Sequence, residues 1–328
     1  MGNGSIDRRR WFGAATAAVI GGSSRRASRA QEPPRADPGP VPIHDADGPE
    51  VEKTLSEAGF EQIRRLRSNH YLALGDGAES FLRSSLTDCE ELLIAYMRHF
   101  RDRGFDVKEP EKPLLVTAFA DDRSFGKYHK MPSLMQGGAQ AVGMYDRATN
   151  LLSVFDWRNV PQVSRAANRN VQTVAHEGTH QLTFNTGLLD READTPTCIV
   201  EGLGTYGEPR KVMGPSDLGR MNVQRADDLA KLRRSLPWIP VRQLLADDST
   251  LRAGLYGKVM LAYAESWALV HLLLNDKGRL PGFRGYLAAV KARKDAEHRL
   301  DDAREHLGDL EELDRDLQAH AVRLVRAL

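Results

Sequence analysis

The chain has few cysteines, with only Cys89 and Cys198 in 328 residues. They could form at most one disulfide, and an oxidising compartment would permit it. Each cysteine, however, lies in a segment with a helical pattern, and two lone cysteines are more often buried thiols. We therefore predict that Cys89 and Cys198 do not pair.

The chain also lacks the patterns of several other classes of protein. After residue 30 no apolar run is long enough to cross a membrane, so no spanning helix is expected in the mature chain. No stripe of lysine and arginine with interleaved aromatic residues is present, which argues against nucleic acid as a partner. No internal repeat is found. The hydrophobic content of 41% and charged content of 28% fit a globular protein with a sizeable core.

The formal net charge of +1 is unevenly distributed. Residues 1–30 carry six arginines and one aspartate, and without their net charge of +5 the rest of the chain carries about −4. Residues 9–12, RRWF, resemble the twin-arginine export signature. A weakly apolar run over 11–20 and a small-residue cleavage site at 28–30 follow. We predict a signal peptide over residues 1–30 and a periplasmic or extracellular protein, without lipid anchoring because no cysteine follows the run.

Apolar periodicity and turn signals predict the organisation of the mature chain. Residues 31–50 contain six prolines and are expected to form a flexible linker. We expect helices over 51–67, 78–103 and 124–129, strands over 70–74 and 113–119, and a hairpin of 141–146 with 151–156. Further helices are expected over 171–185, from Pro196 to Gly207, over 251–274 and within 283–328.

The most informative stretch is an H-E-x-x-H motif that runs from His176 to His180. Residues four apart on a helix share a face, so these two imidazoles can be directed at one ion. Zinc accepts neutral imidazole nitrogens, and a catalytic zinc uses three protein ligands and one water. Glu177 is rotated by about 100° from His176 and is placed to take a proton from that water, whose pKa falls to about 7. The alternative is two helical histidines beside a surface glutamate, but the apolar helical context favours zinc.

A zinc site of this kind needs a third protein ligand. The metzincin solution, a histidine six residues after His180, is excluded because Thr186 occupies that position. Glu201 lies twenty-one residues after His180, in an apolar helix that we predict to begin with Thr195 as N-cap and Pro196 at its first position. A carboxylate buried there without a partner would be costly, and a metal would explain it. The alternative is a glutamate on the solvent side of an amphipathic helix.

This combination of motifs resembles the gluzincins, which are zinc peptidases with H-E-x-x-H and a downstream helical glutamate, here in an E-G-L-x-x-Y setting. From about His70 to its end the chain also resembles a poorly characterised group of exported bacterial gluzincin-like proteins. The resemblance implies an α+β fold with a zincin-like mixed sheet and the active-site helix over residues 51–209. A mainly helical C-terminal part over residues 210–328 would complete the site.

A second likeness concerns Tyr263, which follows Glu201 by sixty-two residues. Its surroundings are similar to those of a tyrosine in the aminopeptidase N group of gluzincins, which hydrogen-bonds the tetrahedral intermediate. A phenol can donate to a developing oxyanion without carrying charge. Tyr206 is the competing candidate, and either tyrosine could be a core aromatic. The G-A-M-E-N motif of those aminopeptidases is absent, which disfavours exopeptidase action.

Other polar residues are weaker candidates. Glu208, seven residues after Glu201, could orient a ligand histidine, although we expect a surface charge. His271 could face the site, but we expect a core residue. If Glu201 is not the third ligand, the next candidates are Asp190, Glu192 and Glu208. The predicted hairpin just before the motif could pair with an extended substrate or be purely structural.

The sequence therefore predicts an exported zinc-dependent metallopeptidase that acts on a peptide or protein substrate. Zn²⁺ would be held by His176, His180 and Glu201, with Glu177 as general base and Tyr263 as oxyanion donor. One alternative is a non-catalytic binding module of the cell envelope with a structural or vestigial zinc site. Another is a zinc hydrolase of a non-peptide substrate. Glu177 favours an enzyme, because a purely structural site has no need of this residue.

Overall fold

The computed structural model describes residues 43–132, 142–161, 163, 166–209, 218–253 and 255–328. The predicted signal peptide and the greater part of the predicted linker lie outside these residues. Among the described helices, none is both long and apolar enough to cross a membrane.

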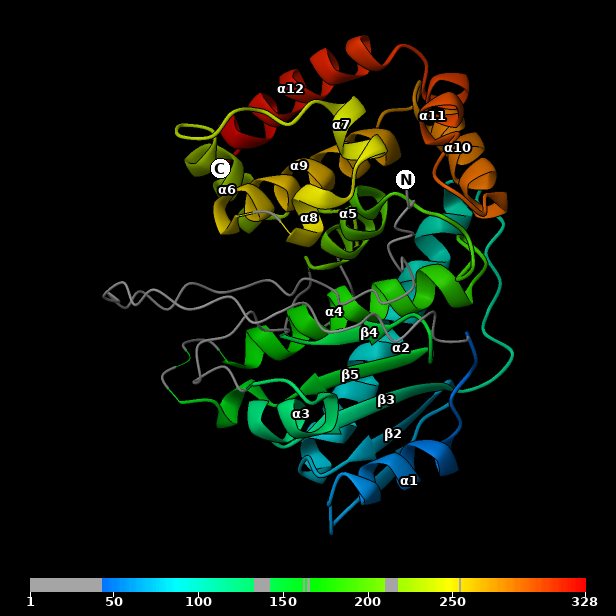
Figure 1. Cartoon of the computed structure of the whole chain (residues 1–328), viewed down its shortest axis with the longest axis vertical. Helices are drawn as coiled ribbons and strands as arrows, with labels where there is room; N and C mark the ends of the chain where they lie inside the picture. The colour runs from blue at the N-terminus through cyan, green and yellow to red at the C-terminus, as the bar shows by residue number, and fades with distance from the viewer. Residues whose placement is uncertain (1–42, 133–141, 162, 164–165, 210–217, 254) are drawn as a thin grey trace, which may run out of the picture.

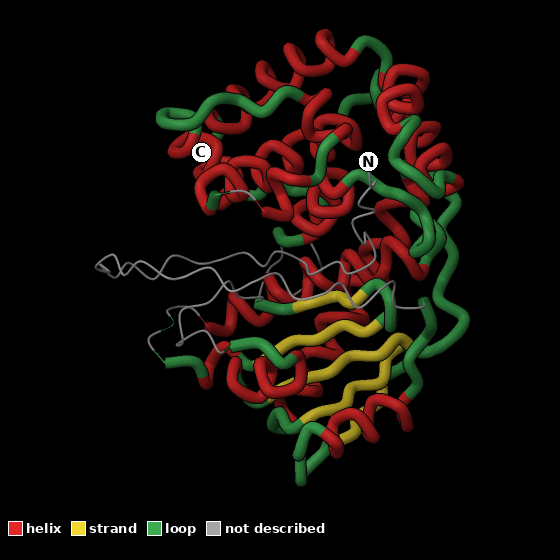
Figure 2. The backbone as a smooth tube through the Cα atoms, in the orientation of Figure 1, coloured by secondary structure: helices red, strands yellow, loops and turns green. Residues whose placement is uncertain are grey.

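A five-stranded mixed sheet forms the lower half of the molecule in Figures 1 and 2. The strands, in the order β1-β2-β3-β5-β4, are β1 (Arg64–Arg67), β2 (Tyr71–Gly75), β3 (Leu114–Phe119), β5 (Leu151–Phe155) and β4 (Met144–Asp146). The three central strands are parallel, whereas the edge strands β1 and β4 run antiparallel to their neighbours. Every residue of the central strands is buried, as expected for strands that are covered on both faces.

Alternate residues of the central strands contribute to two separate hydrophobic cores. Leu72 and Leu74 of β2 pack with α1 (Gly48–Glu57) and α3 (Asp122–His129) on one face. Tyr71 and Ala73 face the other core, which includes α2 (Glu79–Asp102) and α4 (Ala166–Asn185). This alternation follows from the two-residue period of a strand.

The rest of the described chain is helical and lies above α4 in Figure 1. Its helices are α5 (Thr197–Gly207), α6 (Val223–Leu232), α7 (Val241–Ala246), α8 (Ser249–Ala253), α9 (Tyr256–Asn275), α10 (Leu280–Ala292), α11 (Arg299–Leu307) and α12 (Leu310–Arg326). The core on the α2 and α4 face continues through α5 and α9 to α12. The predicted α+β class, with a mixed sheet and a mainly helical C-terminal region, is confirmed.

Three predicted elements differ in the structure. The helix predicted over residues 51–67 ends at Glu57, and residues 64–67 form β1 instead, because their backbone pairs with β2. The helical region predicted over 251–274 is divided between α8 and α9. The N-cap of α5 is Pro196 rather than Thr195. The side chain of Asp248, from a distant segment, accepts the Thr197 N–H at 2.9 Å and takes the place of a local cap.

The two cysteines lie in different helices, Cys89 in α2 and Cys198 in α5, and both are buried. No disulfide joins them, so the prediction that they do not pair is confirmed.

Glu265 is a fully buried carboxyl group on α9 that makes stability depend on pH. It accepts the backbone N–H of Ile239 at 3.2 Å and 3.4 Å. Burial raises its pKa from 4.5 to about 9, so above pH 4.5 the unfolded chain ionises this group while the folded protein keeps it protonated. The contribution of this group to the free energy of unfolding is therefore fully present below pH 4.5 and is lost as the pH rises towards 9.

We expect Glu265→Gln to raise the Tm at pH 8, because glutamine keeps the acceptor for Ile239 and cannot ionise. The difference from the parent should disappear near pH 4. Thermal unfolding across this pH range measures the effect, with the exposed Glu305→Gln as the control. Equal Tm values for Glu265→Gln and the parent at pH 8 would show that Glu265 is not held protonated.

Candidate metal centre

Two helices, α4 and α5, bring His176, His180 and Glu201 together as a group that could hold a metal ion. Nε2 of His176 lies 3.1 Å from Nε2 of His180. Oε2 of Glu201 lies 3.2 Å from the first nitrogen and 3.7 Å from the second. Two ligand atoms bound to one tetrahedral zinc at about 2.0–2.1 Å are about 3.3 Å apart. The three atoms therefore have the spacing of a three-ligand zinc site.

The Glu201 carboxylate is the clearest sign that the group suits a cation. It is 1% exposed, so the alternative of a solvent-facing glutamate is wrong. In the described structure Oε2 has no hydrogen-bond partner of good geometry, and the nitrogens that face it are those of His176 and His180. A buried carboxylate oxygen without a donor is costly. A cation placed between this oxygen and the two imidazole nitrogens would remove that cost.

The charge around the group also favours a divalent cation. Glu177, Glu201 and Glu208 are all buried, and the buried guanidinium of Arg225 pairs with Glu208. With neutral imidazoles, these three carboxylates and one guanidinium have a formal charge of −2. Burial alone would lower the pKa of His176, but Glu201 and Glu208 raise it to about 10, which shows how strongly the surroundings favour positive charge.

Gly204 allows α5 to approach the two imidazoles. It lies one turn after Glu201, and a Cβ atom there would be 2.6 Å from Cε1 of His180 and 3.0 Å from Cε1 of His176. Distances this short cannot be kept without a shift of the rings. Glycine at this position is therefore part of the geometry of the site.

We expect Gly204→Ala to weaken zinc binding about tenfold to a hundredfold. Overpacking costs about 1–3 kcal/mol, and here it acts on the ligand rings themselves. Chelator competition measures the affinity. Gly257→Ala in α9 is the control, because its Cβ would meet only Leu236 Cδ1 at 3.4 Å. A folded Gly204→Ala protein with parental affinity would contradict this account of the glycine.

Glu177 is buried beside the metal group but is not part of it. Its Oε2 accepts the backbone N–H of Tyr145, in the edge strand β4, at 2.9 Å. Burial raises the pKa of Glu177, while His176 and His180 act in the opposite direction and leave it above its ordinary value. A raised pKa brings a carboxylate closer to the range in which a general base works best.

Of the two candidate tyrosines, Tyr263 is the one that faces the histidines. Its ring centroid lies 6.5 Å from that of His176. Burial, together with the Glu201 carboxylate, raises the pKa of Tyr263 well above 10, so the phenol stays protonated and can donate. The hydroxyl of Tyr206 instead lies 3.0 Å from Nε2 of His99 in α2. The structure therefore favours Tyr263 as the phenol near the metal group.

Glu208 is not the surface charge predicted from the sequence. It is 8% exposed, and its Oε1 lies 3.0 Å from Nδ1 of His176. Arg225 donates to the same oxygen at 2.8 Å, and Asn222 donates to Oε2 at 2.7 Å. Arg225 and Asn222 belong to a segment without any motif, so the sequence did not reveal them. The one available signal was that Glu208 shares a helix face with Glu201.

The remaining candidates lie away from the metal group. His271 packs against α12, where its Nδ1 is 3.0 Å from Nε2 of His320. Asp190 and Glu192 lie in the loop between α4 and α5, where Asp190 accepts the backbone N–H of Glu192. Neither joins the group that could hold a metal.

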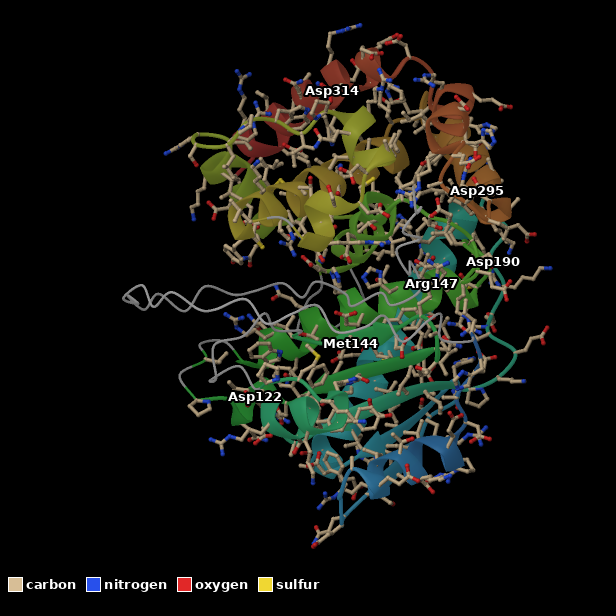
Figure 3. All side chains as sticks on the ribbon, in the orientation of Figure 1. Asp122, Met144, Arg147, Asp190, Asp295 and Asp314 are labelled. Carbon is tan, nitrogen blue, oxygen red and sulfur yellow. The ribbon has the colours of Figure 1, made fainter. Side chains whose placement is uncertain are left out.

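This loop is tied to the sheet by Arg147, which lies in the turn between β4 and β5 (Figure 3). Its guanidinium donates to the carbonyls of Arg191 and Ala193, the latter at 2.5 Å. The predicted hairpin is confirmed, and β4 is an edge strand. Because Tyr145 already donates its N–H to Glu177, part of that edge is used to orient the site.

Residues 170–291 match a family described as a protein of unknown function, DUF1570. The matched segment contains the candidate site residues His176, Glu177, His180, Glu201 and Tyr263. Less than half of the chain is matched, and the description of the family carries no activity. No curated protein matches the chain.

Proposed function

We propose that the chain is a zinc-dependent hydrolase that cleaves peptide bonds. The observation that carries this proposal is the position of Glu177. It is buried directly beside the His176, His180 and Glu201 group, it is not one of the three candidate ligands, and Tyr145 holds it in place. A structural zinc site gains nothing from such a carboxylate, whereas hydrolysis requires a base there.

A zinc ion held by the three residues would supply a Lewis acid and a bound water of lowered pKa. Glu177 would take a proton from the attacking water. The Tyr145 N–H bound to Oε2 fixes the orientation of the carboxylate for this step. The protonated Glu177 can then pass the proton to the leaving amine. Tyr263 keeps its proton and can donate a hydrogen bond to the oxyanion that develops on the substrate.

Cleavage of a broad peptide library, with and without a chelator, tests this function. We expect the purified protein to cleave a subset of the peptides, to lose that cleavage with the chelator and to recover it when zinc is restored. Cleavage that persists after complete removal of the metal would refute the zinc mechanism. A metal-loaded protein that cleaves no peptide in the library would refute the peptidase assignment.

The burial of the group supports a second candidate, a binding module with a structural zinc. His176 is 4% exposed, and His180 and Glu201 are each 1% exposed. Structural zinc sites are closed to solvent, and the burial of these residues matches that feature, although the group supplies three protein ligands and a structural site uses four. The two candidates differ in their need for Glu177, so the substitution of this residue separates them.

We also propose that the protein is exported by the twin-arginine route. The supporting residues, Arg9 and Arg10, lie outside those that the structure describes. Lysine at both positions should leave the precursor in the cytoplasm, because a site that reads guanidinium geometry does not accept lysine as an equivalent. Cell fractionation measures this effect, and lysine at Arg25 and Arg26 is the control within the same leader. Normal export of the Arg9→Lys, Arg10→Lys protein would refute the route.

A further inference from the structure

Both oxygens of Glu208 already accept hydrogen bonds from fixed donors. Oε1 accepts from Nη2 of Arg225 at 2.8 Å, and Oε2 accepts from Nδ2 of Asn222 at 2.7 Å. Asn222 is the N-cap of α6, and its own side chain accepts the backbone N–H of Arg225 at 3.2 Å. The start of α6 is therefore built around this carboxylate, and the positive end of the helix adds to its stabilisation.

This arrangement decides which nitrogen of His176 carries the proton. Oε1 of Glu208 lies 3.0 Å from Nδ1 of His176. A carboxylate paired with Arg225 is ionised and can only accept hydrogen bonds. The hydrogen between Oε1 and Nδ1 is therefore carried by Nδ1. In the neutral imidazole the lone pair is then on Nε2. Nε2 is the nitrogen that faces His180 and Glu201.

Arg225 is placed to control this arrangement. It is fully buried, although it comes from a helix that supplies no candidate ligand. Besides Glu208 it contacts Asp228, with Nη1 3.4 Å from the carboxylate, and its guanidinium lies 5.5 Å from the centre of the Tyr263 ring. It thus joins the outer side of His176 to the tyrosine of the site.

We propose that Arg225 is a positioning residue for metal binding, which acts through Glu208 to hold His176 as the Nδ1–H tautomer with Nε2 free to bind the ion. The proposal rests on the proposed zinc site but not on the identity of the substrate. The proposal gives α6 a role in metal binding. An ion pair that only stabilised the fold would give α6 no such role. A purely structural Arg225 would affect unfolding but not the metal affinity of the folded protein.

The test is zinc affinity, measured by chelator competition at one pH on variants shown to be folded. Partners that orient a ligand histidine are typically worth about 10–100-fold in metal affinity. We expect Arg225→Met and Glu208→Gln each to lose affinity in this range, because a glutamine can donate to Nδ1 and favour the wrong tautomer. Arg225→Lys should lose less, since lysine keeps the charge and a donor.

The double variant shows whether the two residues act together. If Arg225 acts through Glu208, adding Arg225→Met to Glu208→Gln should change the affinity by less than about threefold. The control is Arg299→Lys, another buried arginine with two carboxylate partners, Asp194 and Asp248. This control should change the unfolding temperature and leave zinc affinity at the parental value.

Three results would overturn the proposal. One is a folded Arg225→Met protein that binds zinc with the parental affinity. Another is a double variant whose fold-loss of zinc affinity equals the product of the losses in the two single variants. If Arg225→Met does not fold, parental affinity in Glu208→Gln decides against it. Failure of the zinc site itself is distinguishable, because the parent would then bind no zinc. If the parent binds zinc and cleaves peptides, and the Arg225 and Glu208 variants bind zinc with the same affinity as the parent, only the role of Arg225 is refuted.

Discussion

Glu177→Gln should keep both the zinc and the fold while hydrolysis falls by at least about 10²-fold, the lower range for a general base. Glutamine has nearly the same shape, and its side-chain oxygen can still accept the Tyr145 N–H that holds Glu177 in place. It cannot accept the proton of the attacking water. Because Glu177 is outside the ligand group, the metal affinity should change little.

The measurement combines zinc content, thermal unfolding and the cleavage rate of a peptide that the parent cleaves. Glu90→Gln is the matched control, since Glu90 is a partly buried glutamate of α2 that pairs with His70. It should keep the parental rate. A zinc-loaded Glu177→Gln protein that cleaves at the parental rate would exclude Glu177 as the base, and the structural-zinc candidate would take its place.

His176→Ala and His180→Ala should each remove most of the zinc. Either change leaves one imidazole and one carboxylate, and a tetrahedral site with two protein ligands is far weaker than one with three. We expect the loss of affinity to exceed the 10–100-fold that is typical of residues that only orient a ligand. Glu201→Ala should also weaken binding, because Oε2 faces both ligand nitrogens.

Metal analysis of the purified variants measures the loss directly. His271→Ala provides the control, because His271 is also a helical histidine but pairs with His320 away from the site. It should retain the parental zinc content. Unchanged zinc in both His176→Ala and His180→Ala would contradict the assignment of the metal site to this group.

The sequence by itself was enough to predict the residues of the metal group. His176 and His180 are four residues apart on one helix, so local geometry alone places them on the same face. Glu201 could be predicted because a carboxylate in an apolar helix needs a partner. The central strands were equally predictable, since short apolar runs bounded by turn residues are local signals.

Only the tertiary structure decided which residues support the group. Glu208 was expected at the surface, but α6 covers it with Arg225 and Asn222, and no local pattern reveals contacts made across seventeen and fourteen residues of chain. The strand β1 was also decided by the tertiary structure, because its arginines form a strand only by pairing their backbone with β2. The start of α5 depends on a distant residue as well, because the side chain of Asp248 accepts the Thr197 N–H.

The physical reason is the range of the interactions. Helical faces and strand periods depend on neighbouring residues, and the sequence shows these directly. A buried ion pair or an edge-strand pairing depends on which distant segments meet when the core forms. Propensity does not contain that information, and packing can override it. The residues of the candidate metal group could therefore be predicted from the sequence, while the contacts of Glu208 with Arg225 and Asn222 form only when α4, α5 and α6 come together.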